Sequence, residues 1–190
     1  MNTFTNKTAK TVIEKKIVYI GADPAFRKNG MAVFIKESPT DYYTIIFKNL
    51  RHFQKWIDGL MEDKAPEYAI VGVEVSENDI IFEGHFQNYM KLCKAKDSRN
   101  LRNKYAMSVG KNMAATQYVI DLFKEKYKPR HVFEITAKEK GAKLNERDLH
   151  RNYGIQITGS EQDERDAAVI CEKAIQKHKF AQKVKQAKNG

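Results

Sequence analysis

The chain has 190 residues, of which 42% are hydrophobic and 31% charged, a composition that excludes a disordered chain and fits one folded domain. No apolar run approaches the roughly 18 residues that span a bilayer, and residues 1–16 are polar, so no membrane contact is expected. We therefore expect a protein of the cytoplasm, or of an equivalent compartment that holds DNA, whose net charge of +10 favours a polyanionic partner.

Three strands are predicted near the N-terminus. Residues 17–22 are an apolar run that ends at Asp23-Pro24, a pair that often begins a turn. Residues 31–35 and 42–47 also have strand composition, with turn residues between them. Consecutive strands joined by short turns predict an antiparallel meander.

A helix and a buried strand are predicted next. Residues 49–61 carry apolar side chains at helical spacing, and residues 68–73 are mostly apolar, as in a strand covered on both faces. Glu74 ends that strand. Residues 79–105 contain aromatic and basic side chains without a clear period, so no element is predicted there.

The C-terminal half predicts a helix over 110–127, a strand over 131–135 and a last helix over 161–178 with Ser160 as its N-cap. The order β-β-β-α-β-α-β-α predicts an α/β fold with a mixed five-stranded sheet flanked by helices. The expected organisation is a flexible N-terminal arm at 1–14, one domain at 15–178 and a basic C-terminal tail at 179–190.

Four carboxylates stand where predicted elements end or begin. Asp23 is explained as a turn former, and Asp163 as part of a helix cap. Glu74 at the end of a buried strand is costly without a cation partner, and Asp166 continues a buried helical stripe where an unpaired carboxylate is expensive. Glu74 and Asp166 are therefore the stronger indicators of function.

Convergence of these acids at one sheet edge would require metal, because clustered carboxylates repel one another unless cations neutralise them. Oxygen ligands suit Mg²⁺, with Mn²⁺ as a substitute, whereas Cys93 and Cys171 lack the spacing of a zinc site. Two ions roughly 4 Å apart can activate water and stabilise the leaving oxygen of a phosphodiester. The predicted catalytic and metal-binding residues are Asp23, Glu74, Asp163 and Asp166.

Four sequence blocks extend this prediction. They are IVYIGADP at 17–24 with GMAV at 30–33, VE at 73–74, SVGKNMAA at 108–115, and DERDAA at 163–168. Together they resemble the RuvC-like Holliday junction resolvases of the ribonuclease H-like superfamily, over most of residues 17–178. The resemblance implies a ribonuclease H-like fold, a homodimer, and two metal ions held by the acids of the first, second and last blocks. Where the family carries an aromatic wedge, this chain has Glu77, so Phe82 or Phe86 takes that role or the wedge is absent.

Basic residues predict a DNA-binding surface. Residues 91–104 carry six basic side chains against one acidic one, a pattern that neutralises phosphates without recognising particular nucleobases. Gly110-Lys111-Asn112 is expected to open a helix whose N–H groups could hold a phosphate, and the resemblance implies basic residues near the cleaved phosphate after the last strand. The predicted DNA contacts are Lys91, Lys94, Lys96, Arg99, Arg102, Lys104, Lys111, Lys138, Lys140, Lys143, Phe82 and Phe86.

Three functions stay open at this point. The leading one is an endonuclease that cuts symmetric strands of a four-way DNA junction as a C2 dimer, with the helix at 110–127 as the dimer face by resemblance. A ribonuclease H-like nuclease on RNA–DNA hybrids or other branched DNA would use the same site. A non-catalytic nucleic-acid-binding module would keep only the fold, and clustered carboxylates argue against it because they repel phosphate.

Overall fold

The computed structural model describes residues 16–189 except 28–29, 76–85, 88, 92–93 and 95. The predicted arm at 1–14 and the candidate aromatic Phe82 lie outside the described residues. Five strands form one sheet in the order β3-β2-β1-β4-β5. The strands are β1 (Val18–Arg27), β2 (Gly30–Lys36), β3 (Tyr42–Phe47), β4 (Ala69–Val75) and β5 (His131–Thr136).

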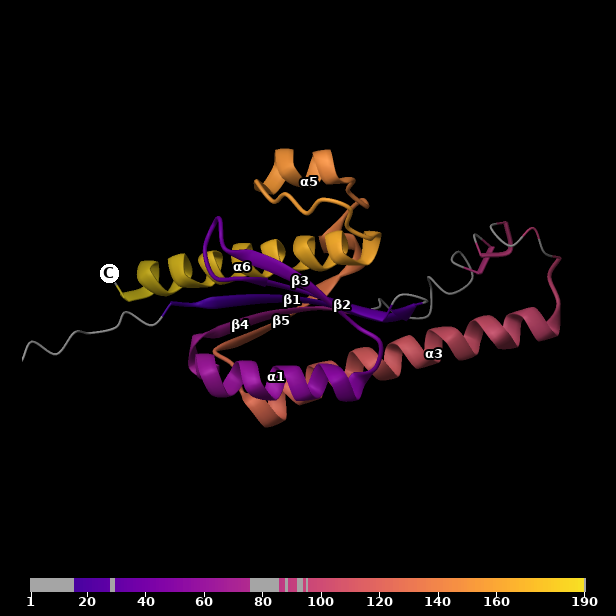
Figure 1. Ribbon diagram of the computed structural model, residues 1–190, viewed down its shortest axis with the longest axis horizontal. Helices are drawn as coiled ribbons and strands as arrows, with labels where there is room; N and C mark the ends of the chain where they lie inside the picture. Colours follow the sequence, from indigo (N-terminus) through magenta and orange to yellow (C-terminus); the bar gives the residue numbers. More distant parts are fainter. Residues whose placement is uncertain are drawn as a thin grey trace, which may run out of the picture.

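Helices cover both faces of this sheet (Figure 1). They are α1 (Leu50–Lys64), η1 (Pro66–Tyr68), α3 (Arg99–Asp121) with its π-helical continuation η2 (Leu122–Tyr127), α4 (Ala137–Lys140), α5 (Glu146–Tyr153) and α6 (Gln162–Asn189). The predicted α/β class, with a mixed five-stranded sheet flanked by helices, is confirmed. Among the helices that the structure describes, none combines the length and apolar character needed to cross a bilayer.

The direction of the strands follows from their connections. Short links make β1, β2 and β3 an antiparallel meander, as predicted. The helical crossovers through α1 and α3 bring β4 and β5 back parallel to β1. The carboxyl ends of β1, β4 and β5 therefore meet at one edge of the sheet.

Two apolar layers hold the helices to the sheet. One face of the sheet packs with α1, α3 and η2, and the core there includes Ile20, Phe53 and Phe123. The opposite face packs with α6 and α5, and its smaller core includes Phe34 and Ala167. Strand side chains alternate between these layers because successive residues point to opposite faces.

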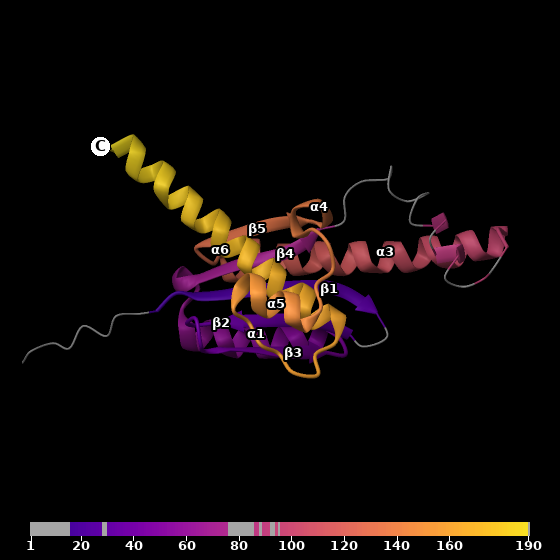
Figure 2. The ribbon, with the colours of Figure 1, turned by 90° about the horizontal axis from the view of Figure 1, so that it is seen from above.

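Glycines allow α6 to lie directly on the sheet. A Cβ at Gly21 would stand 2.2 Å from the carbonyl oxygen of Ala167, and one at Gly72 would stand 2.9 Å from the Cβ of Ala174. Such glycines inside strands permit a close backbone approach that any larger residue prevents. They fix the N-terminal half of α6 above β1 and β4, while its C-terminal end extends past the sheet (Figure 2).

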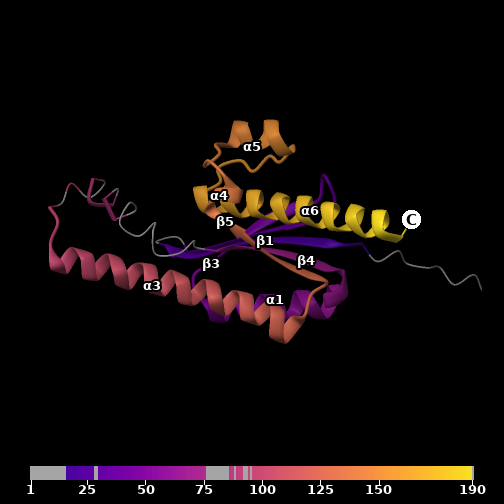
Figure 3. The ribbon, with the colours of Figure 1, turned by 180° about the vertical axis from the view of Figure 1, so that it is seen from behind.

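Several predicted boundaries are wrong. β1 does not turn at Asp23-Pro24 but continues to Arg27, with an irregular register after Asp23. The helix predicted from residue 110 begins at Arg99, where the Ser98 side chain accepts a hydrogen bond from the backbone N–H of Leu101. Seen from behind, the N-terminal half of α3 extends beyond the sheet (Figure 3).

The last helix also differs from its prediction. The Glu164 carboxylate accepts a hydrogen bond from the backbone N–H of Glu161, three residues earlier, and this pair closes the helix start as in a capping box. The helix continues to Asn189, which makes most of the predicted C-terminal tail helical. The short helices α4 and α5 were not predicted.

Candidate functional site

Asp23 and Glu74 lie beside each other at the edge where the parallel strands end. The residue pairs of the β1–β4 ladder end at Ala22 and Val73, directly before these two residues, which continue along the same two strands. Alternation along each strand places Asp23 on the face of Gly21 and Glu74 on the face of Gly72, and that face packs against α6. Asp23 is 3% exposed, so its carboxylate is enclosed by the protein.

Helix α6 brings the other two predicted acids to the same edge. Asp166 directly precedes Ala167, whose carbonyl oxygen lies against Gly21 of β1, and Asp163 lies about one helical turn earlier. Asp163 and Asp166 are both buried. The structure thus gathers the two strand ends and the helix start that carry the four predicted acids.

The Lys140 side chain joins two of these acids. Its Nζ lies 2.8 Å from Oε2 of Glu74 and 2.9 Å from Oδ2 of Asp166. The other carboxylate oxygen of Asp166 accepts a hydrogen bond of 2.7 Å from Nε2 of Gln162. Both oxygens of Asp166 are therefore engaged by side chains of different elements.

Local structure holds Lys140 in place. It is the last residue of α4, which opens with a capping box between Thr136 and Glu139 and closes at Gly141, where a φ of 86° suits glycine. Because α4 follows β5 without a linker, and β5 pairs with β4, the lysine starts close to Glu74.

The neighbouring acids keep Lys140 charged. Burial alone lowers the pKa of this ammonium, but Glu74 and Asp166 outweigh burial, so that the pKa stands above its ordinary value. Lys140 is thus the centre of a triad with Glu74 and Asp166, and its charged end has little access to solvent.

The acids fit a hard divalent cation in chemical type. They offer carboxylate oxygens, which Mg²⁺ and Mn²⁺ prefer, and Lys140 shows that this edge accepts positive charge between Glu74 and Asp166. Within the part of the chain that the structure describes, no three His, Cys, Asp or Glu side chains are arranged to hold a metal ion. The position between these two acids is taken by an ammonium group instead.

Most of the predicted DNA contacts are on the surface. The exposed ones are Lys91, Lys94, Lys96, Arg99, Lys104, Lys111, Lys138 and Lys143. Figure 1 shows that the N-terminal half of α3, which carries Arg99 and Lys104, projects past the end of the sheet where β1 and β4 terminate. This projecting N-terminal half of α3, the α3 overhang, therefore lies at the same end of the molecule as the four acids.

Three predicted contacts differ from expectation. Gly110-Lys111-Asn112 lies inside α3, where backbone N–H groups are used by the helix itself, so the predicted phosphate site at a helix start is wrong. Phe86 is fully buried and is covered by the Arg102 guanidinium at 4.7 Å, so as placed it cannot stack on DNA. Arg102 is also paired with Asp97 at 2.5 Å.

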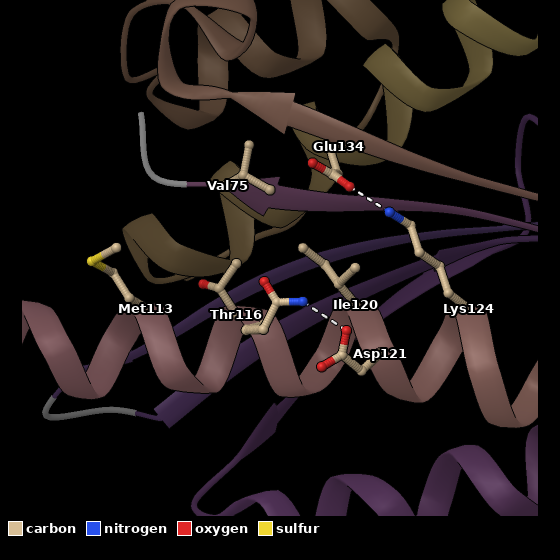
Figure 4. Close-up of a pocket in the computed structure, with 8 residues that line it drawn as sticks. Val75, Met113, Thr116, Ile120, Asp121, Lys124 and Glu134 are labelled. Carbon is tan, nitrogen blue, oxygen red and sulfur yellow. Dashed lines mark hydrogen bonds and ion pairs between the residues drawn. The ribbon is translucent and has the colours of Figure 1, made fainter. Parts of the chain in front are cut away.

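A pocket of about 280 Å³ lies on the opposite face of the sheet, between α3 and the strands β4 and β5 (Figure 4). Its lining includes Val75 and Glu134, whose neighbours along the strands face α6. Glu134 is paired with Lys124 at 2.5 Å across the pocket. This pocket is separated from the four acids by the sheet and has no part in their chemistry.

The sequence did not reveal the residues that support the acids. Lys140 was predicted, with Lys138 and Lys143, as a basic residue near the cleaved phosphate but not as a partner of the acids, and Gln162 was not singled out. Glycines within strands, at Gly21 and Gly72, were the available signal, because a glycine there often marks a close approach of another element.

Comparison with known proteins leaves the site to be interpreted from its own residues. No family model matches the chain, and neither does any curated protein or any solved structure. The resemblance to RuvC-like resolvases therefore depends on the four sequence blocks, while the placement of the acids is an independent structural observation.

Proposed function

We propose that this chain is a divalent-metal-dependent endonuclease of the ribonuclease H-like fold, and that it cuts branched DNA, with four-way junctions as its main substrate. The observation that carries the proposal is the convergence of Asp23, Glu74, Asp163 and Asp166 at one sheet edge, from two adjacent strands and the start of α6. The five-stranded mixed sheet flanked by helices is compatible with that fold.

A structural role alone explains this arrangement poorly. Four acids at one edge, three of them less than a tenth exposed, have an unfavourable mutual repulsion and a high desolvation cost. One lysine offsets part of this cost for Glu74 and Asp166. A hard divalent cation held by these acids would supply an activated water and charge neutralisation for phosphodiester hydrolysis.

The chain's own residues have distinct tasks in this proposal. Gln162 holds one oxygen of Asp166, so the direction of that carboxylate is set before any ligand binds. Arg165 donates through Nε to the carbonyl oxygen of Leu144 and also binds Ser160, which ties the loop around the start of α6. The site is thereby supported by residues beyond its four acids.

The substrate part of the proposal depends on the distribution of charge. Exposed Arg99, Lys104 and Lys111 lie along α3, and exposed Lys138 and Lys143 lie two and three residues from Lys140 in the chain. A duplex arm whose scissile phosphate sits at the acids can extend along the α3 overhang, where the basic side chains neutralise its phosphates. A C2 dimer would present two such sites to a symmetric junction.

Cleavage assays test the proposal directly. Labelled four-way junction, RNA–DNA hybrid and flap substrates are incubated with the full chain in Mg²⁺ and, separately, in Ca²⁺. We expect cleavage of the junction in Mg²⁺ and none by Asp23→Asn or Asp166→Asn, both of which keep DNA binding. Asp121→Asn, on the opposite face, is the matched control and should cut as the wild type does.

Each outcome identifies a different error. No metal-dependent cleavage of any substrate would remove the nuclease proposal and leave a nucleic-acid-binding module. Preference for the hybrid would replace the junction as substrate while keeping the site. If Asp166→Asn loses DNA affinity as strongly as it loses rate, Asp166 is not a metal ligand.

A further inference from the structure

The ammonium of Lys140 is a positive charge that the structure itself supplies to Glu74 and Asp166. Its Nζ is within 2.9 Å of both Glu74 and Asp166, and the side chains of Lys140 and Asp166 are 10% and 3% exposed. Carboxylates with so little access to water need a cation, because an unpaired buried charge is strongly unfavourable. In the absence of metal, Lys140 meets that need.

The attachment of Lys140 allows it to leave without rearranging the fold. Its backbone is fixed at the end of α4 by the Thr136–Glu139 capping box. Its ammonium sits on a flexible four-carbon stem, and rotation of the stem alone can move the charge away from the acids. Lys140 is therefore a cation whose backbone is fixed and whose ammonium group can move.

We propose that Lys140 is a built-in counter-cation that competes with divalent metal for Glu74 and Asp166, and that metal binding displaces its ammonium. This inference rests on the proposed metal-dependent function. A divalent ion bound to the same carboxylate oxygens would stand a few ångströms from the ammonium, where like charges in a poorly solvated site repel strongly. Lys140 consequently stabilises the metal-free protein and weakens its metal affinity.

The competition has two measurable consequences. Without the ammonium, metal no longer displaces a cation, so the affinity for metal rises. Without the ammonium and without metal, the two acids are left unneutralised, so the metal-free protein unfolds at a lower temperature. Added metal then raises the melting temperature of such a variant more than it raises that of the wild type.

Calorimetric titration of the full chain with Mn²⁺, in the absence of DNA, tests the first consequence. Lys140→Met keeps the length of the side chain and removes its charge, and it should bind Mn²⁺ about tenfold more tightly, as expected for a charged hydrogen-bonded partner. Lys140→Arg keeps the charge and should bind no more tightly than the wild type. Lys124→Met removes a lysine paired with Glu134 on the opposite face and should leave the affinity unchanged.

The results separate this inference from the proposed function. Wild-type binding of Mn²⁺ with equal or weaker binding by Lys140→Met overturns the inference alone, whereas no binding by either protein overturns both. If Lys140→Met is unfolded without metal, its folding is followed by circular dichroism during the titration. Folding at Mn²⁺ concentrations below those that half-saturate the wild type supports the competition, and no folding at saturating concentrations overturns it.

Discussion

Replacing Gly21 by alanine tests the close packing of α6 on β1, on which the positions of Asp163 and Asp166 depend. The added Cβ would stand 2.2 Å from the carbonyl oxygen of Ala167 and 2.5 Å from the backbone nitrogen of Cys171. Both contacts are with backbone, so the helix itself must move. Overpacking of this kind costs about 3 kcal/mol where nothing can yield, which lowers the melting temperature of a domain of this size by roughly 6–12 °C.

Urea unfolding followed by circular dichroism gives the free energy of unfolding for each glycine variant. Gly59→Ala is the matched control, since a Cβ added there in α1 meets no atom within 4 Å outside the neighbouring turns of the helix, and it should stabilise the helix by about 0.5–1 kcal/mol. Gly72→Ala should fall between Gly21→Ala and Gly59→Ala, because its closest contacts, at 2.9 Å, are longer than the 2.2 Å and 2.5 Å contacts at Gly21. If the free energy of unfolding of Gly21→Ala is within about 0.5 kcal/mol of that of the wild type, α6 does not lie on β1 as described.

Two further predictions concern Cys171 and the exposed side of α3. Burial raises the pKa of the Cys171 thiol, so native protein at pH 8 should resist alkylation at this residue until urea unfolds it, which peptide mass spectrometry reports. As the pH rises, the thiol ionises in the unfolded chain before it ionises in the folded one. The buried thiol's contribution to the free energy of unfolding is therefore full below about pH 8.5 and declines above it. Rapid labelling of Cys171 in the native protein would contradict its burial. Met113 is 48% exposed on α3, inside the predicted dimer face at 110–127, and in the proposed homodimer Met113→Glu should shift sedimentation velocity toward the monomer. Val184→Glu, on the α6 extension, should not, and an unchanged dimer in Met113→Glu would exclude the face at 110–127.

The sheet was predictable because each strand buries side chains, and burial leaves an apolar pattern. The N-terminal half of α3 escaped prediction for the opposite reason. It projects beyond the sheet, so residues such as Met107 face solvent and no apolar stripe is needed. Hydrophobic periodicity detects a helix only where the helix has a core to face.

The acids were predictable from the cost of burying charge, whereas their partner was not. Asp166 was expected to be buried from its place in an apolar stripe, and it is 2% exposed. Lys140 stands in a polar segment that resembles ordinary surface, and its partners lie 66 and 26 residues away in sequence. Only the packing of α4 against the sheet edge brings these charges together.

A triple substitution in the triad of Glu74, Lys140 and Asp166 distinguishes a role in stability from a role in the reaction. Replacing a buried ion group with apolar residues of similar volume is often neutral or stabilising by about 1–4 kcal/mol, whereas removing one partner costs about 3 kcal/mol or more. Lys140→Met alone should therefore be less stable, in metal-free urea unfolding, than Glu74→Met, Lys140→Met and Asp166→Val combined. We expect the triple variant to unfold within about 1 kcal/mol of the wild type and to cut no DNA. A triple variant less stable than Lys140→Met would make the triad a structural element. A triple variant as stable as the wild type that cuts no DNA would mean that these charges are kept for the reaction.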